Sequence, residues 1–158
     1  MGKEIERKFL VEGNVWRDLA QGIRYRQGYL STVIERTVRV RTIGDKGFIT
    51  IKGQTKGITR SEYEYEIPVD EANIMLDELC EHPLIEKDRY KIAFGKHVWD
   101  VDEFHGENSG LILAEVELEN EEQVFETPEW IGREVSDDAR YFNANLIANP
   151  YRSWREKS

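Results

Sequence analysis

The sequence predicts a single α+β domain over residues 1–158 that is mainly β, with its strands forming an antiparallel sheet. Short segments that alternate apolar and polar residues make up most of the chain, and glycine, asparagine, aspartate or proline separates them. Only three segments have the apolar spacing of a one-faced helix. The length suits one domain with a buried core, and no linker, low-complexity tract or clear repeat divides it.

Eight segments are expected to be strands, because each alternates polar and apolar side chains with a period of two. They cover residues 3–11, 23–31, 34–43, 47–53, 61–69, 85–94, 97–104 and 111–120. The sequence Gly-Asp-Lys-Gly at 44–47 is typical of a hairpin turn, and the Gly-Lys pair at 95–96 indicates another.

Three segments are expected to be helices packed on the sheet. A short one follows a potential cap at Asn14. Residues 70–81 carry a one-sided apolar stripe, and Pro83 ends that helix. Residues 137–148 also place their apolar side chains on one side. The polar tail beyond them is expected to fray unless Trp154 docks it.

Composition and charge narrow the classes of function. The chain has 31 acidic and 22 basic residues and a formal net charge of −9, which disfavours a general nucleic-acid binder but allows a local basic channel. Cys80 is the only cysteine, so neither an intrachain disulfide nor a cysteine-rich zinc site can form. No apolar run approaches membrane-spanning length, and residues 1–11 lack an apolar signal region. We therefore expect a cytoplasmic protein that contacts neither membrane nor nucleic acid.

The first nine residues carry the most informative charge pattern. Glu4, Glu6 and Lys8 occupy alternate positions, so two carboxylates and one ammonium project from one side of a strand. Two such carboxylates repel each other unless a positive charge lies between them, and hard divalent cations such as Mg²⁺ take carboxylate oxygens. A lysine beside such a cation suits a phosphate. The segment therefore suggests a metal–phosphate site.

Charges of one sign also cluster on one face of the later strands. The sets are Arg39 and Arg41; Lys52; Glu62, Glu64 and Glu66; Lys87, Arg89 and Lys91; Asp100 and Asp102; and Glu115, Glu117 and Glu119. An antiparallel sheet usually has one polar face that is exposed to solvent. Such a face usually carries charges of both signs, which these strands do not. Both interpretations, a solvated face and a functional face, are therefore kept. If about eight strands close into a barrel, the charged face can point inward, where it must be wet and filled with ions.

In their order along the chain, these segments resemble the CYTH superfamily, also called triphosphate tunnel metalloenzymes. The resemblance rests on Glu4-x-Glu6-x-Lys8 and on the segments 27–30, 38–41, 50–52, 62–64, 86–90, 100–102, 115–117 and 138–141. It implies an eight-stranded antiparallel β-barrel that forms a tunnel, with helices packed outside. It also implies that the tunnel binds a triphosphate together with Mg²⁺ or Mn²⁺.

The resemblance implies a role for each charged residue. The residues expected to contact phosphate are Lys8, Arg39, Arg41, Lys52, Lys87 and Arg89. The expected metal ligands are Glu4, Glu6, Glu62, Glu64, Asp102, Glu115 and Glu117, with Asp100 a weaker match. Lys87 and Tyr29 are the candidate catalytic residues, although Tyr29 could equally be a core aromatic. The three histidines are expected to be surface or packing residues, and Cys80 a small buried one.

The expected activity is metal-dependent hydrolysis of a phosphoanhydride bond in inorganic tripolyphosphate or a longer polyphosphate. This choice of substrate follows from the resemblance to compact bacterial-type members. Alternatives within the superfamily are a class IV adenylate cyclase, a thiamine or nucleoside triphosphatase and an RNA triphosphatase. A polyphosphate-binding module without catalysis would need the basic residues but not the carboxylates. A homodimer is compatible with the sequence, although no segment indicates an interface.

Overall fold

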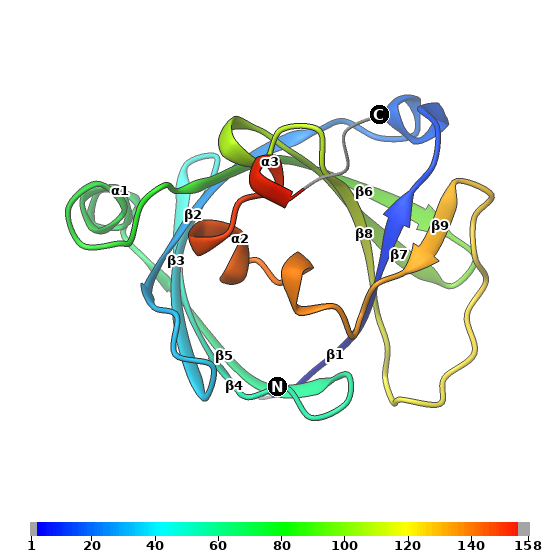
Figure 1. Ribbon diagram of the computed structural model, residues 1–158, viewed down its shortest axis with the longest axis horizontal. Helices are drawn as coiled ribbons and strands as arrows, with labels where there is room; N and C mark the ends of the chain where they lie inside the picture. The colour runs from blue at the N-terminus through cyan, green and yellow to red at the C-terminus, as the bar shows by residue number, and fades with distance from the viewer. Residues whose placement is uncertain (1–2, 155–158) are drawn as a thin grey trace.

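Eight antiparallel strands close into a barrel in the computed structural model, which describes residues 3–154 (Figure 1). The strand order is β5-β4-β3-β2-β6-β7-β8-β1, and pairing of β5 with β1 closes the ring. A ninth strand, β9, pairs with β1 outside the ring. The expected eight-stranded antiparallel barrel is thereby confirmed.

The strands lie close to their expected positions. They are β1 (Lys3–Val11), β2 (Ile23–Ser31), β3 (Arg36–Ile43), β4 (Lys46–Gly53), β5 (Thr59–Ile67), β6 (Ile85–Phe94), β7 (His97–Phe104), β8 (Ile112–Glu117) and β9 (Ile131–Glu134). Both expected hairpins are present, and each turns at a glycine with positive φ, 59° at Gly44 and 61° at Gly95. β8 ends three residues earlier than expected, at Glu117. The sequence does not predict β9, because four residues are too few to show a period.

The helical elements are short, apart from α1 (Val69–Glu78). They are η1 (Val15–Asp18), η2 (Gly106–Asn108), η3 (Ala139–Tyr141), α2 (Asn145–Ala148) and α3 (Tyr151–Trp154). α1 confirms the helix expected near residues 70–81, and its buried Ala72 and Leu76 pack with Val40 of β3 and with Cys80. Cys80 is therefore buried, as expected. None of the helices among residues 3–154 is long and apolar enough to cross a membrane.

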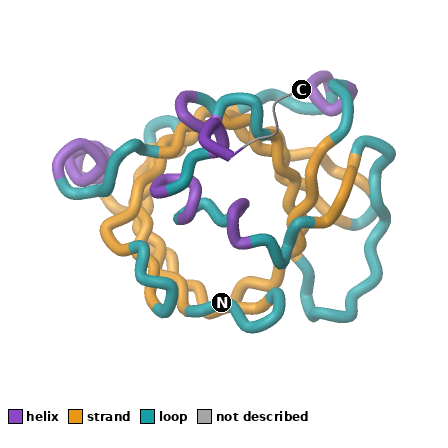
Figure 2. The backbone as a smooth tube through the Cα atoms, in the orientation of Figure 1, coloured by secondary structure: helices purple, strands orange, loops and turns teal. Residues whose placement is uncertain are grey.

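The C-terminal segment differs from its prediction. Residues 137–148 do not form one helix on the outside of the sheet, because Phe142 takes an extended backbone (φ −70°, ψ 134°) and separates η3 from α2. Figures 1 and 2 show this segment running inside the ring of strands. Tyr141 and Leu146 are buried there against Phe104 of β7 and Leu113 of β8. The segment closes one end of the barrel instead of covering its side.

Trp154 docks the end of the described chain, which is the alternative to fraying that the sequence allowed. Its ring packs edge-on against Tyr141 and Tyr151, and its Nε1 donates a hydrogen bond to the carbonyl of Asn149 at 2.9 Å. The docking ties α3 to the segment that closes the barrel.

The outer face of β1, β7 and β8 is apolar and is covered mainly by loops. Trp99 and Val116 lie opposite each other on β7 and β8 and are fully or almost fully buried. Trp16 of η1 and Trp130, just before β9, belong to the same apolar cluster. Because side chains alternate along a strand, burial of this outer set leaves the intervening charged residues pointing into the barrel.

Candidate active site

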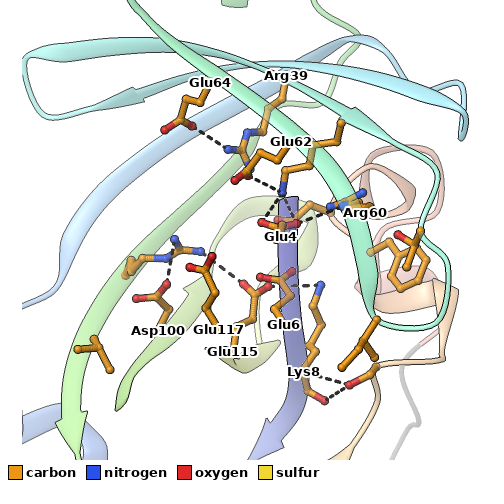
Figure 3. Close-up of a pocket in the computed structure, with 18 of the residues that line it drawn as sticks. Glu4, Glu6, Lys8, Arg39, Arg60, Glu62, Glu64, Asp100, Glu115 and Glu117 are labelled. Atoms are coloured by element: carbon orange, nitrogen blue, oxygen red, sulfur yellow. Dashed lines mark hydrogen bonds and ion pairs between the residues drawn. The ribbon is translucent and has the colours of Figure 1, made fainter. Parts of the chain in front are cut away.

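The inward face of the barrel surrounds a cavity of about 510 Å³ that is lined mostly by charged side chains (Figure 3). All the site residues expected from the sequence line it except Asp102. Those that line it are Glu4, Glu6, Lys8, Tyr29, Arg39, Arg41, Lys52, Glu62, Glu64, Lys87, Arg89, Glu115 and Glu117. The charged face therefore points inward, and the alternative of a solvated outer face is wrong.

Glu4 is already neutralised by two cations. Lys52 of β4 donates to both of its carboxylate oxygens at 3.0 Å, and Arg60 of β5 donates to Oε1 at 3.1 Å. Burial alone would raise the pKa of Glu4, but Lys52 and Arg60 outweigh it and lower the pKa to about 2. Lys52 also lies 3.4 Å from Glu62, so these four residues form one ion-pair network across β1, β4 and β5.

Glu6 and Glu115 form a carboxylate pair between β1 and β8, and a hydrogen bond joins their side chains. Burial, together with the carboxylates of Glu115 and Glu4, raises the pKa of Glu6 well above its usual range. The pKa of Glu115 is lowered despite its burial, because Lys8 and Arg89 lie close to it. Two carboxylates can share a hydrogen bond only when one of them holds a proton. Among the described residues Glu6 forms no ion pair, whereas Glu115 lies 4.0 Å from Lys8 and 3.5 Å from Arg89.

The chemistry of this donor set fits a hard divalent cation. A cation beside Glu6 and Glu115 would replace the shared proton and keep both carboxylates ionised. Across residues 3–154, no three carboxylate, imidazole or thiol groups stand together at the spacing of a complete metal site. Substrate oxygens and water would therefore complete the coordination, which is usual for Mg²⁺ bound through one or two carboxylates.

The guanidinium groups on β3 crowd one another. Burial and the neighbouring Arg39 and Arg89 lower the pKa of Arg41 to about 10. Glu64 compensates only part of this charge, at 3.2 Å from Arg41 and 3.6 Å from Arg39. In the part of the chain that the structure describes, the buried Nε atoms of Arg39 and Arg41 have no hydrogen-bond partner. Two features therefore favour binding of a polyanion: the guanidinium groups repel one another, and their Nε–H donors are unpaired.

Asp102 lies behind the cavity wall and is 1% exposed. It accepts a hydrogen bond from Lys87 at 2.7 Å and two from Arg89 at 2.8 and 2.9 Å. These two cations lower the pKa of Asp102 to about 2 against the effect of burial. Burial in turn lowers the pKa of Lys87 to about 8, although Asp102 opposes that change. The position of Asp102 suits a group that orients two cations, whereas Asp100 on the same strand lines the cavity.

Several lining residues do not appear in the sequence-based set. Arg60 could have been found, because it lies two residues before Glu62 on the inward face of β5. His97, expected at the surface or in packing, lines the cavity at the β6–β7 hairpin. The C-terminal segment contributes Ser136, Phe142 and Asn143, although the apolar spacing of residues 137–148 predicted a helix packed on the outside of the sheet. Tyr29 is buried and lines the cavity, and burial raises its pKa.

Comparison with known proteins places the chain in a family. It matches the CYTH domain over residues 2–151. The protein belongs to the CYTH domain family. It is 56% identical over 156 residues to a protein of Acetivibrio thermocellus named inorganic triphosphatase, a match that covers 99% of this chain and 100% of that protein. CYTH triphosphatases are metal-dependent in general.

A further sequence match and a structural match agree with this assignment. A protein of Nitrosomonas europaea, also named inorganic triphosphatase, is 40% identical over 148 residues, covering 90% of this chain and 95% of the relative. A crystal structure of an inorganic triphosphatase superposes with a TM-score of 0.65 at 36% identity, covering 90% of this chain and 96% of that one. Sequence and fold therefore agree on the family.

Proposed function

We propose that this CYTH protein is an inorganic triphosphatase that hydrolyses a phosphoanhydride bond of tripolyphosphate with the help of Mg²⁺ or Mn²⁺. The observation that carries the proposal is the charged cavity, in which crowded guanidinium groups face the neighbouring carboxylates of Glu6 and Glu115, and Glu6 forms no ion pair among the described residues. Names of the similar proteins from Acetivibrio thermocellus and Nitrosomonas europaea support the same activity.

The basic residues bind and orient the phosphates. Arg39 and Arg41 offer unpaired N–H groups on one wall, and Arg89 offers its guanidinium on the wall formed by β6. Charge-assisted hydrogen bonds from such groups to phosphate are stronger than neutral ones. Because these groups are held by packing and by ion pairs, they need little rearrangement when negative charge builds up in the transition state.

Glu6 and Glu115 are the residues proposed to hold the cation, and the neighbouring Glu117 projects toward the same region (Figure 3). When bound, a divalent cation neutralises phosphate charge and makes a water molecule a better nucleophile. In the proposed reaction, water adds to a terminal phosphorus and the bridging P–O bond breaks, which yields orthophosphate and pyrophosphate. Lys87, fixed by Asp102, places a positive charge beside the reacting phosphates.

The substrate-binding half of the proposal is tested by Arg39→Ala. Loss of a buried guanidinium that donates to phosphate removes about 1.5–3 kcal/mol of binding, so KM for tripolyphosphate should rise roughly 10- to 100-fold. Arg36→Ala is the matched control, because Arg36 lies on the same strand but is exposed and outside the cavity. KM of both variants is measured by steady-state phosphate release from tripolyphosphate. An unchanged KM for Arg39→Ala would contradict the proposed role of the basic wall.

The same assay with ATP separates the hydrolase from a cyclase. A triphosphatase releases orthophosphate or pyrophosphate and forms no cyclic AMP, whereas a cyclase must join the 3′-hydroxyl to the α-phosphate. Cyclic AMP as the main product from ATP, together with no phosphate from tripolyphosphate, would overturn the proposal in favour of the cyclase. Tight binding of tripolyphosphate without turnover in either metal would favour a binding module.

A further inference from the structure

Asn143 is an uncharged polar side chain that the C-terminal segment brings into the cavity. The segment crosses the inside of the ring of strands (Figure 1), and Asn143 lines the cavity there. The chain is anchored on both sides of it. Tyr141 and Leu146 are buried, and the carbonyl of Tyr141 accepts a hydrogen bond from Nζ of Lys8 at 3.1 Å. The backbone at Asn143 is therefore held in place beside the cavity.

The side chain of Asn143 is oriented by Gln27 of β2. Nε2 of Gln27 donates a hydrogen bond to Oδ1 of Asn143 at 3.1 Å. Gln27 is fully buried and does not line the cavity, so the end of the Asn143 amide that remains for the cavity is Nδ2, which has two N–H donors. Within residues 3–154, this Nδ2 group donates no hydrogen bond to the protein. Asn143 therefore offers unpaired N–H donors at the wall of the cavity.

The burial of Gln27 is not explained by stability alone. Its Oε1 atom has no hydrogen-bond partner in the part of the chain that the structure describes. An unpaired buried acceptor is destabilising, and an apolar side chain of the same length would avoid that cost. Among the same residues, the bond to Asn143 is the one hydrogen bond that the Gln27 side chain makes. Contact with Asn143 is therefore what a polar residue provides at this position.

Gln27 also places the Asn143 amide near the basic wall. It lies directly opposite Arg41 in the antiparallel pairing of β2 with β3, where facing Cβ atoms are about 4.5–5.5 Å apart. Burial and the charges of Arg39 and Arg89 already lower the pKa of Arg41 to about 10. Another cation here would add to this repulsion, whereas a neutral amide donates a hydrogen bond without adding charge.

We propose that Asn143 binds a phosphate oxygen of the substrate through its Nδ2–H group, and that Gln27 is the positioning residue that holds the amide in this orientation. The proposal rests on the proposed function, because it adds a neutral donor to the same phosphate-binding site. Asn143 differs from Arg39 and Arg41 in that it contributes direction without charge.

The first test replaces Asn143 by alanine and by aspartate. In Asn143→Ala, KM for tripolyphosphate should rise roughly threefold to tenfold, the effect of one neutral hydrogen bond. The value of kcat should change less than about twofold, because the bond is present both before and during the reaction. Asn143→Asp should raise KM further, since a carboxylate repels phosphate. An unchanged KM in Asn143→Ala, or a KM in Asn143→Asp no higher than in Asn143→Ala, would overturn the proposal.

Asn145→Ala is the matched control. Asn145 lies in the same segment and its Nδ2 donates to the carbonyl of Ala139 at 2.8 Å, but it is exposed and does not line the cavity. Its KM should stay within about twofold of that of the unaltered protein, as for most surface substitutions. Because KM does not depend on the fraction of folded protein, partial unfolding cannot imitate the effect. Equal rises of KM in Asn143→Ala and Asn145→Ala would overturn the phosphate contact.

The second test asks whether Gln27 acts through Asn143. Gln27→Met keeps the length of the side chain and removes the donor, so KM should rise as it does in Asn143→Ala. In the double variant Gln27→Met/Asn143→Ala, KM should stay within about twofold of that of Asn143→Ala, because residues that act as one unit do not have additive effects. No rise of KM in Gln27→Met, or a double variant in which the two rises multiply, would overturn the positioning role.

Failure of the proposed function is recognised separately. If the unaltered protein does not hydrolyse tripolyphosphate, the proposed function fails, and the role of Asn143 is judged by binding of tripolyphosphate in the presence of a chelator, measured by calorimetry. Weaker binding by Asn143→Ala than by Asn145→Ala would support the phosphate contact. Equal binding by the two variants, or no binding by the unaltered protein, would overturn it.

Discussion

Replacing Glu6 by glutamine is expected to lower kcat/KM for tripolyphosphate by at least about 100-fold, because loss of even an indirect metal contact costs about 10- to 100-fold. The amide keeps the size of the side chain and its hydrogen bond to Glu115, so the variant removes one negative charge at the proposed cation site. The loss should shrink when the Mg²⁺ concentration is raised, since the variant binds the cation more weakly.

Glu66→Gln is the control for this experiment. Glu66 follows the same alternation as Glu62 and Glu64 on β5, but it is exposed and does not line the cavity. Its replacement should change kcat/KM less than about twofold, since a surface charge that far outside the cavity is screened by salt. If Glu6→Gln retained the activity of Glu66→Gln at every Mg²⁺ concentration, the carboxylate pair would have no part in binding the cation.

Asp102→Asn is expected to lower the free energy of unfolding by about 3–5 kcal/mol, the range measured when one partner of a buried ion pair is removed. Lys87 and Arg89 would keep their positive charges in the interior without the carboxylate that now compensates them. Chemical denaturation with a chelator present measures the change. The chelator matters, because a role as metal ligand predicts a loss only when metal is bound, whereas the ion-pair role predicts the same loss without metal.

Asp88→Asn provides the comparison on the neighbouring strand. Asp88 pairs with Arg24 at 2.8 Å on the outside of the barrel, where the Arg24 side chain is 55% exposed. A pair of this kind contributes about 0–1 kcal/mol. If Asp102→Asn lowers the free energy of unfolding no more than Asp88→Asn does, Lys87 and Arg89 do not depend on Asp102 for compensation of their charge.

The inward face of the barrel could be predicted from the sequence because a strand repeats with a period of two. Glu4, Glu6 and Lys8 lie on one face of β1 in the structure, as their spacing indicates. The period also extends to Arg60, which shares the inward face of β5 with Glu62. A period, however, does not reveal whether a charged face points inward or outward. That choice depends on closure of the sheet by the pairing of β5 with β1, which joins distant parts of the chain.

Depth within the barrel could not be predicted from alternation. Asp100 and Asp102 share a face of β7, yet Asp100 lines the cavity and Asp102 is sealed behind it. The difference arises because the C-terminal segment fills the inner end of the barrel beside Phe104. The apolar spacing of that segment predicts one helix, but the extended backbone of Phe142 divides it into η3 and α2. Long-range packing therefore decides which members of a predicted face reach the substrate.

Phosphate release from tripolyphosphate by the purified protein is the direct test of the proposed triphosphatase activity. It should be measured with Mg²⁺, with Mn²⁺ and with a chelator, with Glu6→Gln measured in parallel. Release should require a divalent cation, end when the chelator is added, and be strongly reduced in the variant. No release with either cation, or release that continues unchanged in the chelator and in Glu6→Gln, would contradict the proposed function.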